Sequence, residues 1–216
     1  MERDIYKNLQ EWKDSITRQP LLLRGARQTG KTFIINYFGN KLFKYFITLN
    51  FERNPEYTEI FKTRIPAEII EKITLFTGQK IEPGKTLLFF DEIQECPEAI
   101  ISLRYFFEEM PELHVIGAGS LLEFALMSEE FRMPVGRIQY LYIYPMSFGE
   151  FLDAMEETEL RNFIGNYDNL TRLPKGLHEK LNEYIRKYYI IGGMPAVVKE
   201  YISSRDIIKC QRIQRS

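Results

Sequence analysis

The fold of this chain is decided by one stretch, Gly25-Ala26-Arg27-Gln28-Thr29-Gly30-Lys31-Thr32. The stretch matches the pattern G-x-x-x-x-G-K-[ST], in which a glycine-rich loop wraps a chain of phosphates. Residues 20–24, which read Pro-Leu-Leu-Leu-Arg, form an apolar run that predicts a buried strand, and residues 33–38 favour a buried helix. Strand, glycine loop and helix is the context that this phosphate-binding P-loop needs. The sequence therefore predicts a nucleotide site here.

The spacing of the loop follows from phosphate chemistry. Gly25 and Gly30 allow backbone angles that residues with a Cβ resist, so successive N–H groups can point inward as an anion nest. The following helix adds the positive end of its dipole. We expect Lys31 to reach the β- and γ-phosphates and the Thr32 hydroxyl to ligate Mg²⁺. The nucleotide-binding residues are predicted to be Gly25, Ala26, Arg27, Gln28, Thr29, Gly30, Lys31 and Thr32.

A second acidic motif follows the apolar strand predicted at residues 86–90. A strand without polar alternation is buried on both faces, as in a parallel sheet, and ligands bind at the carboxyl ends of such strands. Asp91 at that end is expected to hold the Mg²⁺ through water, as a Walker B acid does, and Glu92 to polarise an attacking water. Gln94 has two interpretations: it orients the water or Glu92, or it is simply a polar residue of the following loop.

The remaining pattern alternates strands and helices and then becomes helical. Residues 4–17 read as a helix with Ile5, Leu9, Trp12 and Ile16 on one face. Further strands are predicted at 45–51, 113–117 and 138–144, the last an edge strand, and further helices at 66–77, 97–110, 121–130, 147–164, 175–190 and 207–216. Ser203 with Asp206 resembles a capping box for the last helix. We divide the chain into residues 1–146, a P-loop domain, and residues 147–216, a helical lid and the start of a C-terminal domain.

Composition narrows the class of protein. The chain has 216 residues and a net charge of −1, so no global charge attracts nucleic acid or an acidic membrane. Cys96 and Cys210 show neither metal spacing nor a disulfide framework, and His114 is interpreted as structural. No apolar run reaches 18 residues and the start is too polar for a signal peptide, so we expect a cytoplasmic protein without a membrane span.

Six segments together carry a resemblance to a known family. They are LNFE at 49–52, LLFFDEIQECP at 87–97, GAGSLLE at 117–123, GRIQYLYIYPMSFGEFL at 136–152 and GGMPAVV at 192–198, after LLLRGARQTGKT at 21–32. In order and spacing they resemble the bacterial and archaeal AAA-type P-loop ATPases that carry a C-terminal domain of unknown function. The resemblance implies an α/β three-layer sandwich with a parallel five-stranded sheet of order 5-1-4-3-2, followed by a helical segment. Family members continue well past GGMP, so this chain is expected to be cut within or before that domain.

The resemblance also implies two catalytic residues besides Lys31 and Glu92. Ser120 matches the sensor position at the end of the inserted strand, where a polar group contacts the γ-phosphate or the water. Arg137 lies where related ATPases place an arginine finger, which acts in cis or in trans. The alternative for Arg137 is a surface arginine paired with a carboxylate.

Together these observations predict an ATP-binding protein, an Mg²⁺-dependent ATPase whose hydrolysis drives movement of the helical part. The alternative is a nucleotide-gated binding module with little or no turnover; a small-molecule kinase fits the Asp91-Glu92 pair less well. Expected partners are ATP and ADP, a homo-oligomer, and a protein or DNA. The DNA suggestion rests on the basic tail residues Arg205, Lys209, Arg212 and Arg215. The choice of ATP over GTP stays open at this point.

Overall fold

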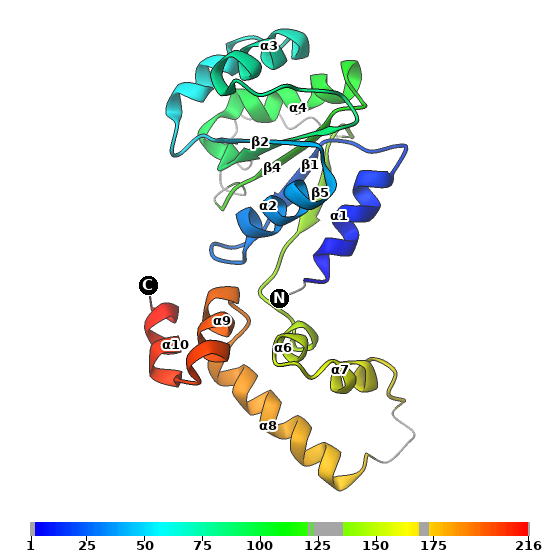
Figure 1. Ribbon diagram of the computed structural model, residues 1–216, viewed down its shortest axis with the longest axis vertical. Coiled ribbons are helices and arrows are strands. Elements are labelled where there is room, and N and C mark those ends of the chain that lie inside the picture. The colour runs from blue at the N-terminus through cyan, green and yellow to red at the C-terminus, as the bar shows by residue number, and fades with distance from the viewer. Residues whose placement is uncertain (1–2, 121, 123–135, 169–172, 216) are drawn as a thin grey trace. The chain divides into compact units, whose positions relative to one another are not determined.

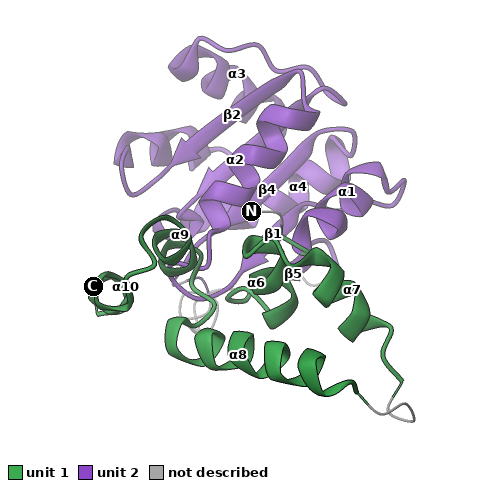
Figure 2. Cartoon of the chain, turned by 60° about the horizontal axis from the view of Figure 1, so that its bottom comes forward, with its two compact units in different colours: residues 1–4, 144–216 green, residues 5–143 purple. Residues whose placement is uncertain are grey.

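The computed structural model describes residues 3–120, 122, 136–168 and 173–215. Their contacts divide the chain into two compact units (Figure 2). The sheet unit comprises residues 5–143, and the helical unit comprises residues 1–4 together with residues 144–216. The chain therefore passes between the units twice, at residues 4–5 and at residues 143–144.

The sheet unit is built on a five-stranded parallel sheet (Figure 1). Its strands are β1 (Leu21–Arg24), β2 (Tyr45–Asn50), β3 (Thr86–Asp91), β4 (His114–Ala118) and β5 (Gln139–Tyr142). Their order is β2-β3-β4-β1-β5, and every pairing is parallel. This is the predicted order 5-1-4-3-2 read from the other edge, so the predicted fold class is confirmed, including β5 as an edge strand.

Helices cover both faces of this sheet (Figure 1). Successive side chains of a strand point to opposite faces. Leu21 and Leu23 accordingly pack with α1 (Ile5–Asp14) and α2 (Lys31–Leu42). Leu22 instead joins the core under α3 (Pro66–Thr77), α4 (Pro97–Glu109) and the 3₁₀ segment Pro55–Lys62. All six residues of β3 are buried, as the unbroken apolar run predicts for a central parallel strand.

The helical unit has its own core. Its described helices are α6 (Phe148–Ala154), α7 (Thr158–Gly165), α8 (Lys175–Ile191), α9 (Pro195–Ser204) and α10 (Ile207–Gln214). Met146, Phe151, Ile191 and Val198 are among the buried residues that they share. A buried ion pair, Arg3 Nε to Glu150 Oε1 at 2.8 Å, ties the first residues of the chain to α6.

Several predicted helix boundaries are wrong. The first helix ends at Asp14, so Ile16 lies outside it and is fully exposed rather than on its buried face. The helix predicted over 147–164 is two helices, because Glu156 takes the left-handed conformation (φ 64°) between them. Asp206, not Ser203, caps α10, since its carboxylate accepts from the N–H groups of Ile208 and Lys209. The helix predicted over 121–130 lies outside the described residues, Leu122 excepted.

Both cysteines and His114 are buried. Cys96 and Cys210 are buried and unpaired, and burial raises the pKa of the Cys96 thiol to about 12. His114 is buried against the rings of Trp12 and Phe43, and burial lowers its pKa to about 4, which fits a structural role. In the described ranges no three His, Cys, Asp or Glu side chains cluster as metal ligands. None of the helices described is long and apolar enough to cross a membrane.

Candidate functional site

The glycine loop follows β1 and ends where α2 begins at Lys31. Gly30 has φ 91° and Gln28 has φ 65°, so the backbone turns in the left-handed region that a compact loop requires. Gly25 has φ 151°, and a Cβ there would lie 2.2 Å from the carbonyl oxygen of Ile143. Glycine at position 25 therefore lets the loop start tightly against the end of β5. The loop backbone then meets the N-terminus of α2, a favourable place for an anion.

Lys31 lies folded over this loop. Its ammonium donates to the carbonyl oxygens of Gly25 and Ala26, both at 2.8 Å, and the Thr29 hydroxyl also donates to Ala26. Burial lowers the pKa of Lys31, while the charges of Glu92 and Asp91 act in the opposite direction. The two acids are thus close enough to Lys31 for their charges to act on it. Ala26, Arg27 and Gln28 are exposed along the loop.

Thr32 and Asp91 meet across the gap between α2 and β3. The Thr32 hydroxyl donates to the Asp91 carboxylate, 3.2 Å from Oδ1 and 3.3 Å from Oδ2. Asp91 is only 4% exposed, and desolvation raises its pKa, opposed by hydrogen bonds from Asn50 and Thr32. A hydroxyl and a carboxylate are oxygen ligands of the kind that Mg²⁺ prefers beside phosphates. The donor set therefore fits the predicted ion.

Glu92 and Ser120 come together at the ends of β3 and β4. These strands are neighbours in register, with Asp91 opposite Ala118. The Ser120 backbone N–H donates to Glu92 Oε2 at 3.2 Å, and Gln94 Nε2 donates to the same oxygen at 2.8 Å. Gln94 thus lies in the turn that follows β3 and contacts Glu92.

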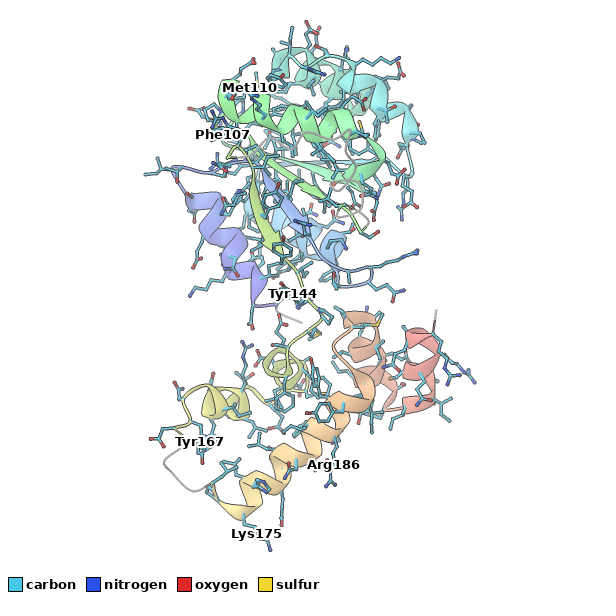
Figure 3. All side chains as sticks on the ribbon, turned by 180° about the vertical axis from the view of Figure 1, so that it is seen from behind. Phe107, Met110, Tyr144, Tyr167, Lys175 and Arg186 are labelled. Carbon is cyan, nitrogen blue, oxygen red and sulfur yellow. The ribbon has the colours of Figure 1, made fainter. Side chains whose placement is uncertain are left out.

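Arg137 is not brought to this site. Arg137 precedes β5, whose first residue pairs with Leu21 at the start of β1. The glycine loop follows the other end of β1, where Arg24 pairs with Tyr142. The strand alone spans about 10 Å at about 3.3 Å per residue. Arg137 Nε pairs instead with Glu108 Oε1 at 3.0 Å, and the guanidinium lies over the ring of Phe107. Figure 3 shows Phe107 beside Met110 at the C-terminal end of α4. Arg137 therefore lies at the opposite end of β5 from the glycine loop of the same chain, because parallel strands separate their two ends.

Asn50 is the residue that sequence reasoning missed. It ends β2, and its Nδ2 donates to Asp91 Oδ2 at 2.9 Å. The signal was present in the sequence, because the LNFE segment places a polar side chain at the carboxyl end of a predicted strand. Carboxyl ends of neighbouring parallel strands meet at one edge, so this position belonged with Asp91.

With this geometry in view, the relatives of the chain are informative. A sequence model of the family described as AAA domain matches residues 17–152, which include the loop, Asn50, the Asp91-Glu92 pair and Ser120. The chain belongs to this AAA domain family. The match supports a nucleotide-binding, P-loop protein of the AAA ATPase type and ends within α6, at Leu152. No functionally curated protein matches the chain in sequence.

Three solved structures are reported as similar to the chain. The Walker-type ATPase PABY2304 of Pyrococcus abyssi aligns with a TM-score of 0.54 at 18% identity, over 98% of this chain and 71% of that one. The Aeropyrum pernix ORC1 protein in complex with DNA gives a TM-score of 0.45 at 15% identity, over 74% of this chain and 50% of that one. C. elegans PCH-2 gives a TM-score of 0.49 at 12% identity, over 96% of this chain and 64% of that one. At such identities, the Pyrococcus protein supports the fold alone.

Proposed function

We propose that this protein is an Mg²⁺-dependent ATPase that cleaves the β–γ bond of ATP with water as the nucleophile. The observation that carries the proposal is the Thr32–Asp91 contact of 3.2 Å at the glycine loop, with Glu92 next in the chain. A loop that binds phosphates, a pair of oxygen ligands and a separate carboxylate are the parts that hydrolysis of a nucleoside triphosphate requires.

Each residue has a distinct task in the proposed reaction. The loop N–H groups and the Lys31 ammonium bind the phosphates, and Lys31 exchanges its bonds to the Gly25 and Ala26 carbonyls for phosphate oxygens. Thr32 and Asp91 would hold Mg²⁺, which when bound neutralises charge on the phosphate oxygens. Glu92 takes the proton of the attacking water. Ser120, which follows β4 beside Glu92, is proposed to contact the γ-phosphate or the water.

Glu92→Gln tests the assignment of the base. We expect the variant to bind ATP normally but to release phosphate roughly 10²–10⁴-fold more slowly, the usual contribution of a general base. Glu98→Gln is the matched control, because Glu98 is an exposed acid in the first turn of α4. Normal turnover in Glu92→Gln, with Glu98→Gln also active, would exclude Glu92 as the base.

Hydrolysis is proposed to move the helical unit. Two features support this role: the chain joins the units only through residues 4–5 and 143–144, and Ile143 abuts Gly25 at the start of the loop. A change in the loop on hydrolysis would thus act on the residue before the second crossing. A fluorophore pair placed on the two units would report the movement, and equal transfer efficiency with ATP and ADP would contradict it.

A nucleotide-gated binding module with little turnover is the second candidate. Arg205, Lys209, Arg212 and Arg215 are exposed at and along α10, a basic surface that suits DNA backbone or an acidic protein. ATP-dependent binding of duplex DNA that weakens steeply with salt, without steady-state phosphate release, favours this candidate. Phosphate release at rates typical of enzymes favours the first.

A further inference from the structure

We propose that Gln94 is a positioning residue for Glu92: it anchors one carboxylate oxygen so that the other is left for the attacking water. The proposal rests on the proposed ATPase function and adds a residue to it. A glutamate side chain has three rotatable bonds, and a base is effective only when its oxygen is held near the proton that it removes. An anchor at one oxygen supplies this restriction.

The hydrogen bonds that the Glu92 carboxylate accepts from the described residues fall on one of its two oxygens. Oε2 accepts from the Gln94 side chain at 2.8 Å and from the Ser120 backbone at 3.2 Å. Within the described part of the chain, Oε1 accepts none. The backbone of Glu92 is left-handed, with φ 50°, and begins the short 3₁₀ turn Ile93–Glu95 that carries Gln94. The turn therefore brings Gln94 back onto the carboxylate two residues before it.

The amide of Gln94 can present only its NH₂ group here. Nε2 lies 2.8 Å from Glu92 Oε2 and 3.4 Å from Glu95 Oε1, and both of these atoms are acceptors. Its Oε1 is buried without a hydrogen-bond partner among the described residues. An unpaired buried acceptor costs about 1–3 kcal/mol. The side chain keeps this conformation nonetheless, which indicates that the bond to Glu92 determines it.

Gly119 makes room for this arrangement. A Cβ at position 119 would lie 1.8 Å from Gln94 Oε1 and 3.0 Å from Gln94 Cδ, and its three nearest atoms all belong to Gln94. The φ of Gly119 lies outside the left-handed region, so the backbone there does not require glycine, and the atoms nearest to an added Cβ are those of Gln94. Gly119 also directly precedes Ser120, the second donor to Glu92. The pairing of β3 with β4, the turn that carries Gln94 and the lack of a side chain at Gly119 therefore together allow two donors to reach Glu92 Oε2.

Gln94→Ala and Gly119→Ala test the proposal together. We expect each to lower kcat for ATP by roughly tenfold to a hundredfold, since a misplacement of about 1 Å is enough for such losses. The KM and the dissociation constant for ATP should stay within twofold, because neither residue belongs to the loop. Gln10→Ala and Gly165→Ala are the controls: Gln10 is exposed in α1, and nothing lies within 4 Å of a Cβ at Gly165.

The double variant gives the sharpest result. If Gly119→Ala acts by displacing Gln94, it costs nothing further once Gln94 is alanine, so the double variant should match Gln94→Ala alone. Losses that multiply would overturn the proposal. So would a normal kcat in Gln94→Ala while Glu92→Gln is slow, and this outcome leaves the proposed function intact. Normal turnover in Glu92→Gln would instead refute the proposed function.

Folding is checked separately. Each variant is compared with the wild type in its thermal midpoint and its ATP affinity. If Gln94→Ala fails to fold, Gln94→Met keeps the size of the side chain and removes the donor. The same loss in kcat with unchanged ATP affinity is expected, and an unchanged kcat in Gln94→Met would overturn the role of Gln94.

Discussion

Asn50 lets the proposed metal site be probed without touching either proposed ligand. Its amide donates to the Asp91 carboxylate at 2.9 Å, whereas the Thr32 hydroxyl lies 3.2 Å and 3.3 Å from the two oxygens. Of the two side chains that donate to Asp91, Asn50 therefore makes the shorter hydrogen bond. Asn50→Ala removes it and leaves a carboxylate that is 4% exposed with one side-chain donor.

The magnitude follows from the type of bond. A hydrogen bond to a charged group contributes about 1.5–3 kcal/mol. If that energy is spent on orienting Asp91 toward the ion, its loss weakens Mg²⁺ binding by about 10- to 150-fold, at about 1.4 kcal/mol per factor of ten. Asn50 also accepts from the N–H of Arg53 in the turn after β2, so a small loss of stability is expected as well.

The assay is a titration of phosphate release with Mg²⁺ at saturating ATP. We expect the Mg²⁺ concentration that gives half-maximal phosphate release to rise by about 10- to 150-fold. The maximal rate at saturating Mg²⁺ should change little. Asn40→Ala is the control, because Asn40 is exposed on α2 and its side chain donates to the carbonyl of Asn36 in the same helix. An unchanged Mg²⁺ requirement in a folded Asn50→Ala protein would refute the view that Asn50 orients a metal ligand.

Two further predictions concern the ion pairs. Glu150→Ala should destabilise the helical unit by about 3–5 kcal/mol, because it removes the carboxylate that pairs with the buried Arg3 guanidinium and that closes the capping box at Ser147; urea unfolding followed by a probe in α8 measures this, and a loss below about 1 kcal/mol would contradict it. Arg137→Ala should leave turnover in dilute protein unchanged, since Arg137 lies at the far end of β5 and its exposed pair with Glu108 contributes little. Turnover per molecule that rises with protein concentration, and no longer rises in Arg137→Ala, would instead assign Arg137 a role in trans.

Local chemistry explains which parts of the site were predictable. The glycine loop is contiguous in sequence, so its conformation follows from its own residues. Asp91 and Glu92 were predictable because the unbroken apolar strand before them is typical of a central parallel strand, and such strands place their ends at the ligand edge. The bounds of the last helix were predictable in part, but its packing was not: α10 buries Cys210, whereas Ile207 and Ile208 are exposed.

The sequence by itself determined the phosphate loop, the acidic strand end and the alternation that makes a parallel sheet, because each depends on residues close together in the chain. The tertiary structure alone decided which side chains meet across strands. Strand order places Asn50 on Asp91 and the Ser120 N–H on Glu92, while the direction of β5 leaves Arg137 at the other end of the sheet. The space beside Gly119 that Gln94 fills is likewise a product of packing, since positions 94 and 119 meet only when β3 and β4 pair.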